Sequence, residues 1–124
     1  MDKRPTIKWQ DMPQEHDYPA AESYLRLIIG RQAAKNEIRK LKRAAISMLA
    51  AKDIFRASRL SLLGAGNGHV DRDRAKIIQQ EKISPLLLCV DKRSGTLVVA
   101  DGYHRLCAVY TFDEDAMIPC KIAE

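Results

Sequence analysis

Residues 101–105, Asp-Gly-Tyr-His-Arg, combine groups that are suited to binding a phosphate. A β-branched stretch precedes them and an apolar run follows, which is typical of a strand that leads directly into a helix. The first N–H groups of a helix lack partners within it, and the helix dipole adds partial positive charge there. A glycine permits the tight turn, a guanidinium binds a phosphate in bidentate fashion, and a histidine adds a donor. The segment therefore predicts an anion site made by Gly102, Tyr103, His104 and Arg105.

Each of these side chains also has a structural alternative. Asp101 can orient a ligand hydroxyl, hold a magnesium ion, or brace His104 or Arg105. Arg105 either binds phosphate or forms a salt bridge with Asp101. His104 either donates to phosphate or bonds a backbone carbonyl, and Tyr103 either stacks on a base or ribose or packs on the surface.

A second glycine-rich segment, residues 64–68, can close over the same junction. His69 follows it directly. A histidine whose pKa lies near neutrality can act as a general base, so His69 and Asp101 are the candidate catalytic residues. The alternative for His69 is an exposed residue at the start of a helix.

The cysteines and the remaining histidine predict neither disulfides nor a metal site. Cys89, Cys107 and Cys120 are an odd number without a Cys-x-x-Cys spacing, and all lie in apolar surroundings. This pattern indicates buried free thiols in a reducing cytoplasm, with a reactive thiol as the alternative. His16 has no partner at a metal-ligand spacing.

The elements that must position these residues follow from periodicity and turn signals. Asp17 and Pro19 suit the start of a helix, and Gly30 ends or bends it before a second helix, so the two form a hairpin. The later pattern predicts, in order, a strand and short helix over 45–58, a helix over 69–83, strands over 86–91 and 96–101 joined by a turn, a helix over 102–112 and a strand over 116–122.

Apolar positions at helical spacing predict which side chains face the core. The first 16 residues form an extended arm, which Trp9 anchors. Continuous apolar strands imply a sheet that is buried on both faces. The inward-facing set is Tyr24, Leu27 and Ile28, then Ala34, Ile38, Leu41 and Ala45, then Ile77 and Ile78, with Tyr110.

Composition and charge limit the classes of protein. The chain has 124 residues, 46% hydrophobic and 30% charged, which suits one globular domain. No apolar run is long enough for a membrane span or signal peptide, so the expected location is the cytoplasm. Residues 24–43 carry seven basic residues and one acidic residue, a local charge of +6. The basic helix Arg31–Arg43 can attract nucleic acid, or it can simply be a solvated helix face.

Residues 85–122, "PLLLCVDKRSGTLVVADGYHRLCAVYTFDEDAMIPCKI", resemble the second half of the ParB/sulfiredoxin-like domain. In that family a proline-initiated strand, a hairpin and a second strand lead into a phosphate box and a helix. The similarity covers about residues 48–124. It implies an α+β domain over 46–124, with a small mixed sheet, and an N-terminal arm and helical extension over 1–45.

The box resembles three branches of this family to different degrees. ParB-type CTP-binding proteins have Gly-Glu-Arg-Arg, of which Gly102 and Arg105 match, and their later Glu-Asn-x-x-Arg motif is missing. Sulfiredoxins have Gly-Cys-His-Arg, but Tyr103 replaces their nucleophilic cysteine. The free-serine kinases have Asp-Gly-His-His-Arg, in which only Tyr103 differs, although their glutamate before the preceding helix is missing. The resemblance therefore implies binding more strongly than chemistry.

The sequence favours a stand-alone, regulatory or binding module that binds a nucleotide or another phosphate ligand at Asp101–Arg105. The resemblance implies ATP, ADP or CTP with magnesium as the ligand. One alternative is a small-molecule, serine-like kinase, which would be a nucleotide-dependent phosphotransferase. Another is a partition-related accessory protein that binds DNA. The helical hairpin can pack on its own domain or on another subunit, as in a homodimer.

Overall fold

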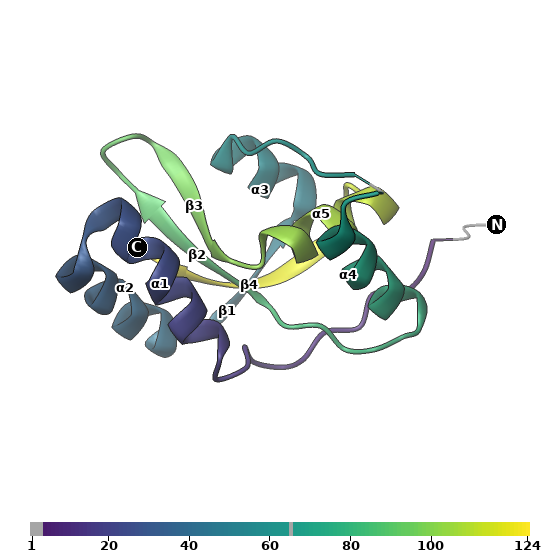
Figure 1. Cartoon of the computed structure of the whole chain (residues 1–124), viewed down its shortest axis with the longest axis horizontal. Helices are drawn as coiled ribbons and strands as arrows, with labels where there is room; N and C mark the ends of the chain where they lie inside the picture. The colour runs from purple at the N-terminus through teal and green to yellow at the C-terminus, as the bar shows by residue number, and fades with distance from the viewer. Residues whose placement is uncertain (1–3, 65) are drawn as a thin grey trace.

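Along the chain, two helices precede a strand, two further helices precede a pair of strands, and a last helix precedes the last strand (Figure 1). The structure is a computed structural model that describes residues 4–64 and 66–124. Within these residues, five helices and four strands form an α+β fold with a helical pair at the N-terminal side, as predicted. Their bounds are α1 Asp17–Ile29, α2 Arg31–Arg43, β1 Ile46–Ala50, α3 Ala51–Ser58, α4 Gly68–Ile78, β2 Leu86–Asp91, β3 Thr96–Asp101, α5 Tyr103–Phe112 and β4 Met117–Ala123.

The strands form one mixed sheet in the order β1-β4-β2-β3. β1 pairs antiparallel with β4, β4 pairs parallel with β2, and β2 pairs antiparallel with β3. The predicted hairpin between β2 and β3 is present, and Gly95 closes its turn with a φ of 68°. β2 is a central strand, and its residues from Leu86 to Cys89 are all buried.

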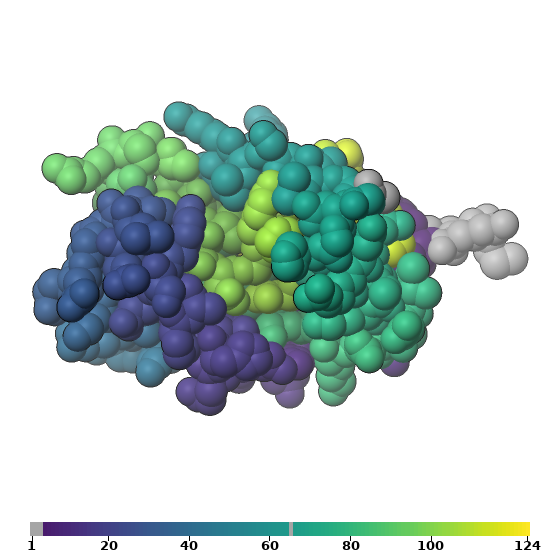
Figure 2. Space-filling view, in the orientation of Figure 1, coloured from purple at the N-terminus to yellow at the C-terminus, as the bar shows by residue number. Residues whose placement is uncertain are grey.

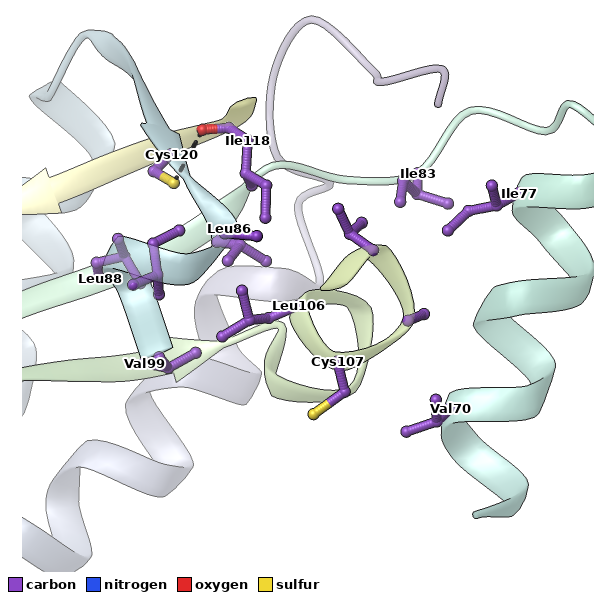
Figure 3. Packing of buried hydrophobic residues seen from close by; sticks show 14 residues of the cluster. Val70, Ile77, Ile83, Leu86, Leu88, Val99, Leu106, Cys107, Ile118 and Cys120 are labelled. Carbon is purple, nitrogen blue, oxygen red and sulfur yellow. Dashed lines mark hydrogen bonds between the residues drawn. The ribbon is translucent and has the colours of Figure 1, made fainter. Parts of the chain in front are cut away.

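The sheet contributes side chains to two hydrophobic clusters, because successive residues of a strand point to opposite faces. Leu86 and Leu88 pack into the cluster that contains α3, α4 and α5 (Figure 3). Leu87 and Cys89 pack into the cluster that contains α1 and α2. Burial of both faces explains why β2 is apolar at consecutive positions rather than at alternate ones.

The helical hairpin packs on the sheet of its own chain. Gly30 joins the two helices with a φ of 88°, a conformation that favours glycine. The inward residues are Tyr18, Ala21 and Leu25 from α1 and Ala34, Ile38 and Leu41 from α2, and they contact Leu87, Cys89, Ala100 and Ala123.

Several expected core positions are wrong, and α1 shows the reason. Its buried stripe is Tyr18, Ala21 and Leu25, so the helix is rotated relative to our prediction. Tyr24, Leu27 and Ile28 are therefore 45%, 79% and 47% exposed. Similarly, Ile77 is buried but Ile78 is exposed, and Ala45 lies beyond the end of α2 and is exposed. Tyr110 is half-buried and packs against the first cluster as predicted.

Asp17 does not occupy the N-cap position, which belongs to His16. Asp17 is the first helical residue, and its side chain accepts a hydrogen bond from the backbone N–H of Gln14 at 2.9 Å. The predicted helix start is thus one residue late, while the carboxylate still stabilises the turn that precedes α1.

The N-terminal arm is anchored beside the segment that leads into β2. Trp9 forms an isolated parallel bridge with Ile83 and packs against the first cluster. Around it, the N–H of Gln10 donates to the carbonyl of Ile83 at 2.8 Å. The predicted role of Trp9 as an anchor is confirmed for the described part of the arm.

The three cysteines are free and buried. Burial raises the pKa of Cys89 and Cys120 to about 12, so both thiols stay protonated at neutral pH. Among the helices that the structure describes, none combines the length and apolar character needed to cross a bilayer.

Candidate anion-binding site

The junction between β3 and α5 is formed by a bulge and a glycine. The pairing register moves from Leu88 opposite Val99 to Leu87 opposite Asp101, so Ala100 is an extra residue in β3. A bulge bends its strand and redirects the side chains next to it. Gly102 then occupies the N-cap position with a φ of 107°, and α5 begins at Tyr103. The predicted transition from a strand to a helix at Gly102 is therefore confirmed.

Gly102 is confined on the side where another residue would carry a Cβ atom. A Cβ there would lie 2.3 Å from Cδ2 of Leu86 and 2.9 Å from Nη2 of Arg105. Leu86 is fully buried in the first cluster. The box therefore needs glycine both for its backbone conformation and for the close approach of β2.

Arg105 forms hydrogen bonds that fix the junction to the start of β2. Its Nε donates to the carbonyl of Ser84 at 3.0 Å, and its Nη2 donates to the carbonyl of Pro85 at 3.3 Å and to Oδ2 of Asp101 at 3.0 Å. The salt bridge that was one alternative for this arginine is thus present. Within the part of the chain that the structure describes, Nη1 has no hydrogen-bond partner, so it is available to a ligand.

Asp101 braces Arg105 in a partly buried position. Burial raises the pKa of its carboxyl group, while the Arg105 guanidinium opposes that shift. Its Oδ2 accepts from Arg105, and Oδ1 accepts no hydrogen bond from any described residue. Asp101 thus has one oxygen committed to the fold and one that can face a ligand.

The two helix starts at this site differ in how their N–H groups are satisfied. At α4, the side-chain oxygen of Asn67 accepts from the N–H groups of His69 and Val70, at 3.1 and 3.2 Å. At α5, Gly102 offers no side-chain cap, and the first intrahelical bond comes from Leu106. No described residue accepts a hydrogen bond from the first three N–H groups of α5, so these groups are open to an anion.

One face of α4 lies opposite the start of α5 and completes a pocket of about 190 Å³. Figure 2 shows the β3–α5 segment in a hollow between the purple-blue N-terminal helices and the teal α4. The pocket is lined by His69, Arg72, Asp73 and Lys76 from α4 and by Asp101, Gly102, Tyr103, His104 and Arg105. We name it the anion pocket.

Arg72, Asp73 and Lys76 were missed by sequence reasoning. With His69 they stand at positions i, i+3, i+4 and i+7, which share one face of a helix, so this spacing could have found them. The pocket then holds three permanent cations against two carboxylates. Asp71, which is also close to His69 in sequence, instead accepts from the N–H of Gly66 at 3.1 Å.

His69 and His104 face each other in the anion pocket. Their ring centroids are 4.7 Å apart and the rings are tilted by 32°. Burial lowers the pKa of His104, the neighbouring His69 lowers it further, and Asp73 opposes the shift. A bound anion would favour the protonated ring, because it adds negative charge beside the pair.

Tyr103 ties the chain between α3 and α4 to the junction. Its hydroxyl donates to the backbone carbonyl of Ser61. Burial raises the pKa of this phenol, and the neighbouring Cys107 thiol adds to the effect. The segment that contains Gly64, Gly66 and Gly68 therefore starts beside the junction; residue 65 lies outside the described residues.

The structure brings the candidate catalytic residues and the candidate phosphate-binding residues together, but no described residue of the segment 64–68 lines the same pocket. His69 and residues 101–105 line one pocket. His16 is the N-cap residue of α1, and its Nε2 lies 3.4 Å from Oδ1 of Asp17. Among the described residues, no group of three or more histidine, cysteine, aspartate or glutamate side chains could hold a metal ion.

Comparison with known proteins finds no family model, no curated protein and no solved structure that matches this chain.

Proposed function

We propose that this protein binds a nucleotide or another phosphate-bearing ligand in the anion pocket. The observation that carries the proposal is the uncapped start of α5, which faces the cationic side of α4 across a hollow of about 190 Å³. A helix N-terminus and converging cations are two independent sources of affinity for a phosphate. The protein would act as a binding or regulatory module in the cytoplasm.

The contributions of the individual groups can be separated. The open N–H groups at the start of α5 would hold phosphate oxygens, and Nη1 of Arg105 would add a donor whose orientation the other guanidinium bonds already fix. Arg72 and Lys76 would supply charge from the opposite wall. If the ligand is a nucleotide with magnesium, Asp73 and the free oxygen of Asp101 are the carboxylates within the pocket that could contact the ion.

The resemblance to the ParB/sulfiredoxin-like family supports the same proposal. Its phosphate box falls on residues 101–105, and the α+β arrangement of a strand, hairpin, strand and helix is present around that box. Tyr103, which replaces the sulfiredoxin cysteine, is bonded to the fold through Ser61. This arrangement favours binding over sulfiredoxin chemistry.

Isothermal titration with ATP, ADP, CTP and GTP in the presence of magnesium tests the proposal. We expect wild-type protein to bind at least one of them, and Arg72→Ala with Lys76→Ala to weaken binding about tenfold or more. These two side chains are exposed, whereas Arg105→Ala would also remove bonds that hold the fold. Lys92→Ala, in the turn between β2 and β3, is the matched control. Absence of binding at millimolar ligand would refute the proposal.

A small-molecule kinase is the second candidate, and the position of His69 favours it. His69 lies across the anion pocket from Asp101 and can accept a proton there. In such a reaction the serine hydroxyl would attack the terminal phosphorus of ATP or ADP, lose its proton to His69, and release ADP or AMP. Phosphoserine formation that His69→Ala abolishes, without loss of nucleotide binding, would establish it. Nucleotide binding without phosphate transfer to any hydroxyl compound tested would exclude the kinase and favour the binding module.

A further inference from the structure

A second hollow of about 350 Å³ lies on the other side of the β3–α5 junction. It shares Asp101, Gly102, Tyr103 and His104 with the anion pocket, so the two hollows meet at the same four residues. Its remaining walls are Ala20 and Tyr24 from α1, Leu60 from the segment after α3, and Val99 and Ala100 from β3. We name it the apolar pocket.

The two pockets differ in chemistry. Of the described residues that line the apolar pocket, none is lysine or arginine, whereas three line the anion pocket. Tyr24 and Leu60 are 45% and 38% exposed, and both line the hollow rather than the core. Apolar surface next to a few converging polar groups is the usual composition of a small-molecule site.

A hydrogen bond and a set of buried side chains hold the walls of the apolar pocket in place. The hydroxyl of Tyr103 bonds the carbonyl of Ser61, which fixes the segment that carries Leu60. α1 is fixed by Tyr18, Ala21 and Leu25, which are buried against the sheet. The orientation of α1 about its axis that buries this stripe also places Tyr24 in the lining of the hollow.

We infer that the ligand is a phosphoester with an aromatic organic part, which binds in the apolar pocket while its phosphate binds in the anion pocket. This inference rests on the proposed function. Two tyrosines, Tyr24 and Tyr103, line the apolar pocket, and aromatic rings gain from stacked or edge-to-face contacts with them. Asp101 lines both hollows, and its Oδ1, which accepts no hydrogen bond from a described residue, can accept an N–H or O–H of the ligand. Nucleoside phosphates and simple aryl phosphates share this chemistry.

The helical hairpin therefore has a role in specificity as well as in packing. α1 lies outside the residues that resemble the ParB/sulfiredoxin-like domain, yet it supplies Ala20 and Tyr24 to the site. Removal of this wall should change which phosphoesters bind without changing affinity for phosphate itself.

Titration calorimetry with four probes tests the inference: inorganic phosphate, glycerol phosphate, phenyl phosphate, and AMP as a nucleoside phosphate. We expect wild-type protein to bind phenyl phosphate and AMP about tenfold more tightly than inorganic phosphate. Glycerol phosphate should bind with nearly the same affinity as inorganic phosphate, because it has no aromatic ring. Tyr24→Ala and Leu60→Ser should remove most of this gain and leave the affinity for inorganic phosphate within about twofold. Leu27→Ala is the matched control, since Leu27 is a more exposed α1 residue outside the pocket lining.

The outcomes separate the inference from the proposed function. Equal affinities for phenyl phosphate and inorganic phosphate would overturn the aromatic subsite while phosphate binding stands. A gain for phenyl phosphate that survives both Tyr24→Ala and Leu60→Ser would place the ring elsewhere and would also overturn it. No binding of any of these phosphates or of the four nucleotides would refute the proposed function itself.

Discussion

At the level of single residues, the segment Asp101–Arg105 has a structural role beside its proposed role in phosphate binding. Gly102 and Arg105 hold the β3–α5 junction against the start of β2, through close contact with Leu86 and through bonds to Ser84 and Pro85. The N–H groups of Tyr103, His104 and Arg105 donate no hydrogen bond to a described residue. The glycine and arginine would thus be needed for folding even without a ligand.

Gly102→Ala should destabilise the protein by about 2–4 kcal/mol, because a left-handed φ and overlap with a buried leucine act together. Gly95→Ala isolates the first cause, since Gly95 has a φ of 68° and nothing within 4 Å of the added Cβ. It should cost only about 1 kcal/mol. Urea unfolding measures both values. Equal losses in the two variants would show that the overlap with Leu86 is relieved without cost.

Anion binding should depend on pH through His104. Its pKa in the folded protein is lowered by burial and by His69, and an anion beside it reverses that shift. Binding therefore takes up a proton, and affinity should rise as pH falls from 8 to 5.5. Sulfate is the suitable probe because it does not titrate in this range. His104→Asn should flatten the profile; an unchanged slope in this variant would contradict the assignment.

The same shift has a consequence for stability without ligand. Because the folded state lowers the pKa of His104, protons bind the unfolded state more readily. The contribution of this residue is complete above its ordinary pKa of about 6.5 and is lost as pH falls below that value. Thermal unfolding in chloride should show this loss between pH 7 and 5. In His104→Asn this loss of stability should be smaller than in wild type. A loss of equal size in the two proteins would show that other groups cause it.

At the level of elements, α2 presents its charge to solvent because its apolar stripe is buried. Ala34, Ile38 and Leu41 face the sheet, so the cations from Arg31 to Arg43 lie on the exposed side, with Glu37 the one acidic residue of the helix. Lys40 lies 3.4 Å from that glutamate. Arg39 donates a hydrogen bond to the neutral Asn36 and Lys42 lies over the Tyr18 ring, so these contacts leave their charges unneutralised and able to attract a polyanion.

This face should bind duplex DNA only through its charge. We expect weak binding of mixed-sequence DNA at 50 mM salt that falls steeply and is largely lost by 200 mM, because counterion release weakens with added salt. Lys35→Ala with Arg43→Ala should reduce the salt slope, whereas Arg72→Ala in the anion pocket should leave it unchanged. Affinity that persists at 200 mM salt and depends on DNA sequence would contradict this prediction and favour a DNA-binding role.

At the level of the whole molecule, the two hydrophobic clusters lie on either face of one sheet. Leu87 and Leu88 are neighbours in β2, and each is fully buried in a different cluster. Lys121 of β4 strengthens the link, since its buried amino group donates to the carbonyl of Lys42 at the end of α2 at 3.2 Å. We therefore expect the helical hairpin and the rest of the chain to unfold together.

Leu87→Ala tests this coupling, because it removes contacts only from the cluster that contains the hairpin. It should cost about 2–5 kcal/mol. Trp9 packs against the opposite cluster, so its fluorescence reports the other side of the sheet. The Trp9 transition and the circular dichroism transition should shift to the same lower urea concentration, as they should in Leu88→Ala. An unshifted Trp9 transition would show that the hairpin is a separate unit.

Local pattern and turn chemistry were enough to predict much of this protein. The junction at Gly102, the turn at Gly95, the break at Gly30 and the inward stripe of α2 follow from backbone preference and periodicity, which neighbouring residues set. The doubly buried strand Leu86–Cys89 follows from its continuous apolar run.

The tertiary structure alone decided which groups surround the junction. Arg105 donates hydrogen bonds to carbonyls 21 and 20 residues earlier in the chain. The α4 face that carries Arg72 reaches α5 through packing between distant segments. The rotation of α1, which leaves Tyr24 in the apolar pocket, depends on the face of the sheet that the helix covers. These contacts join residues far apart in the chain, and local periodicity carries no information about which distant surfaces will meet.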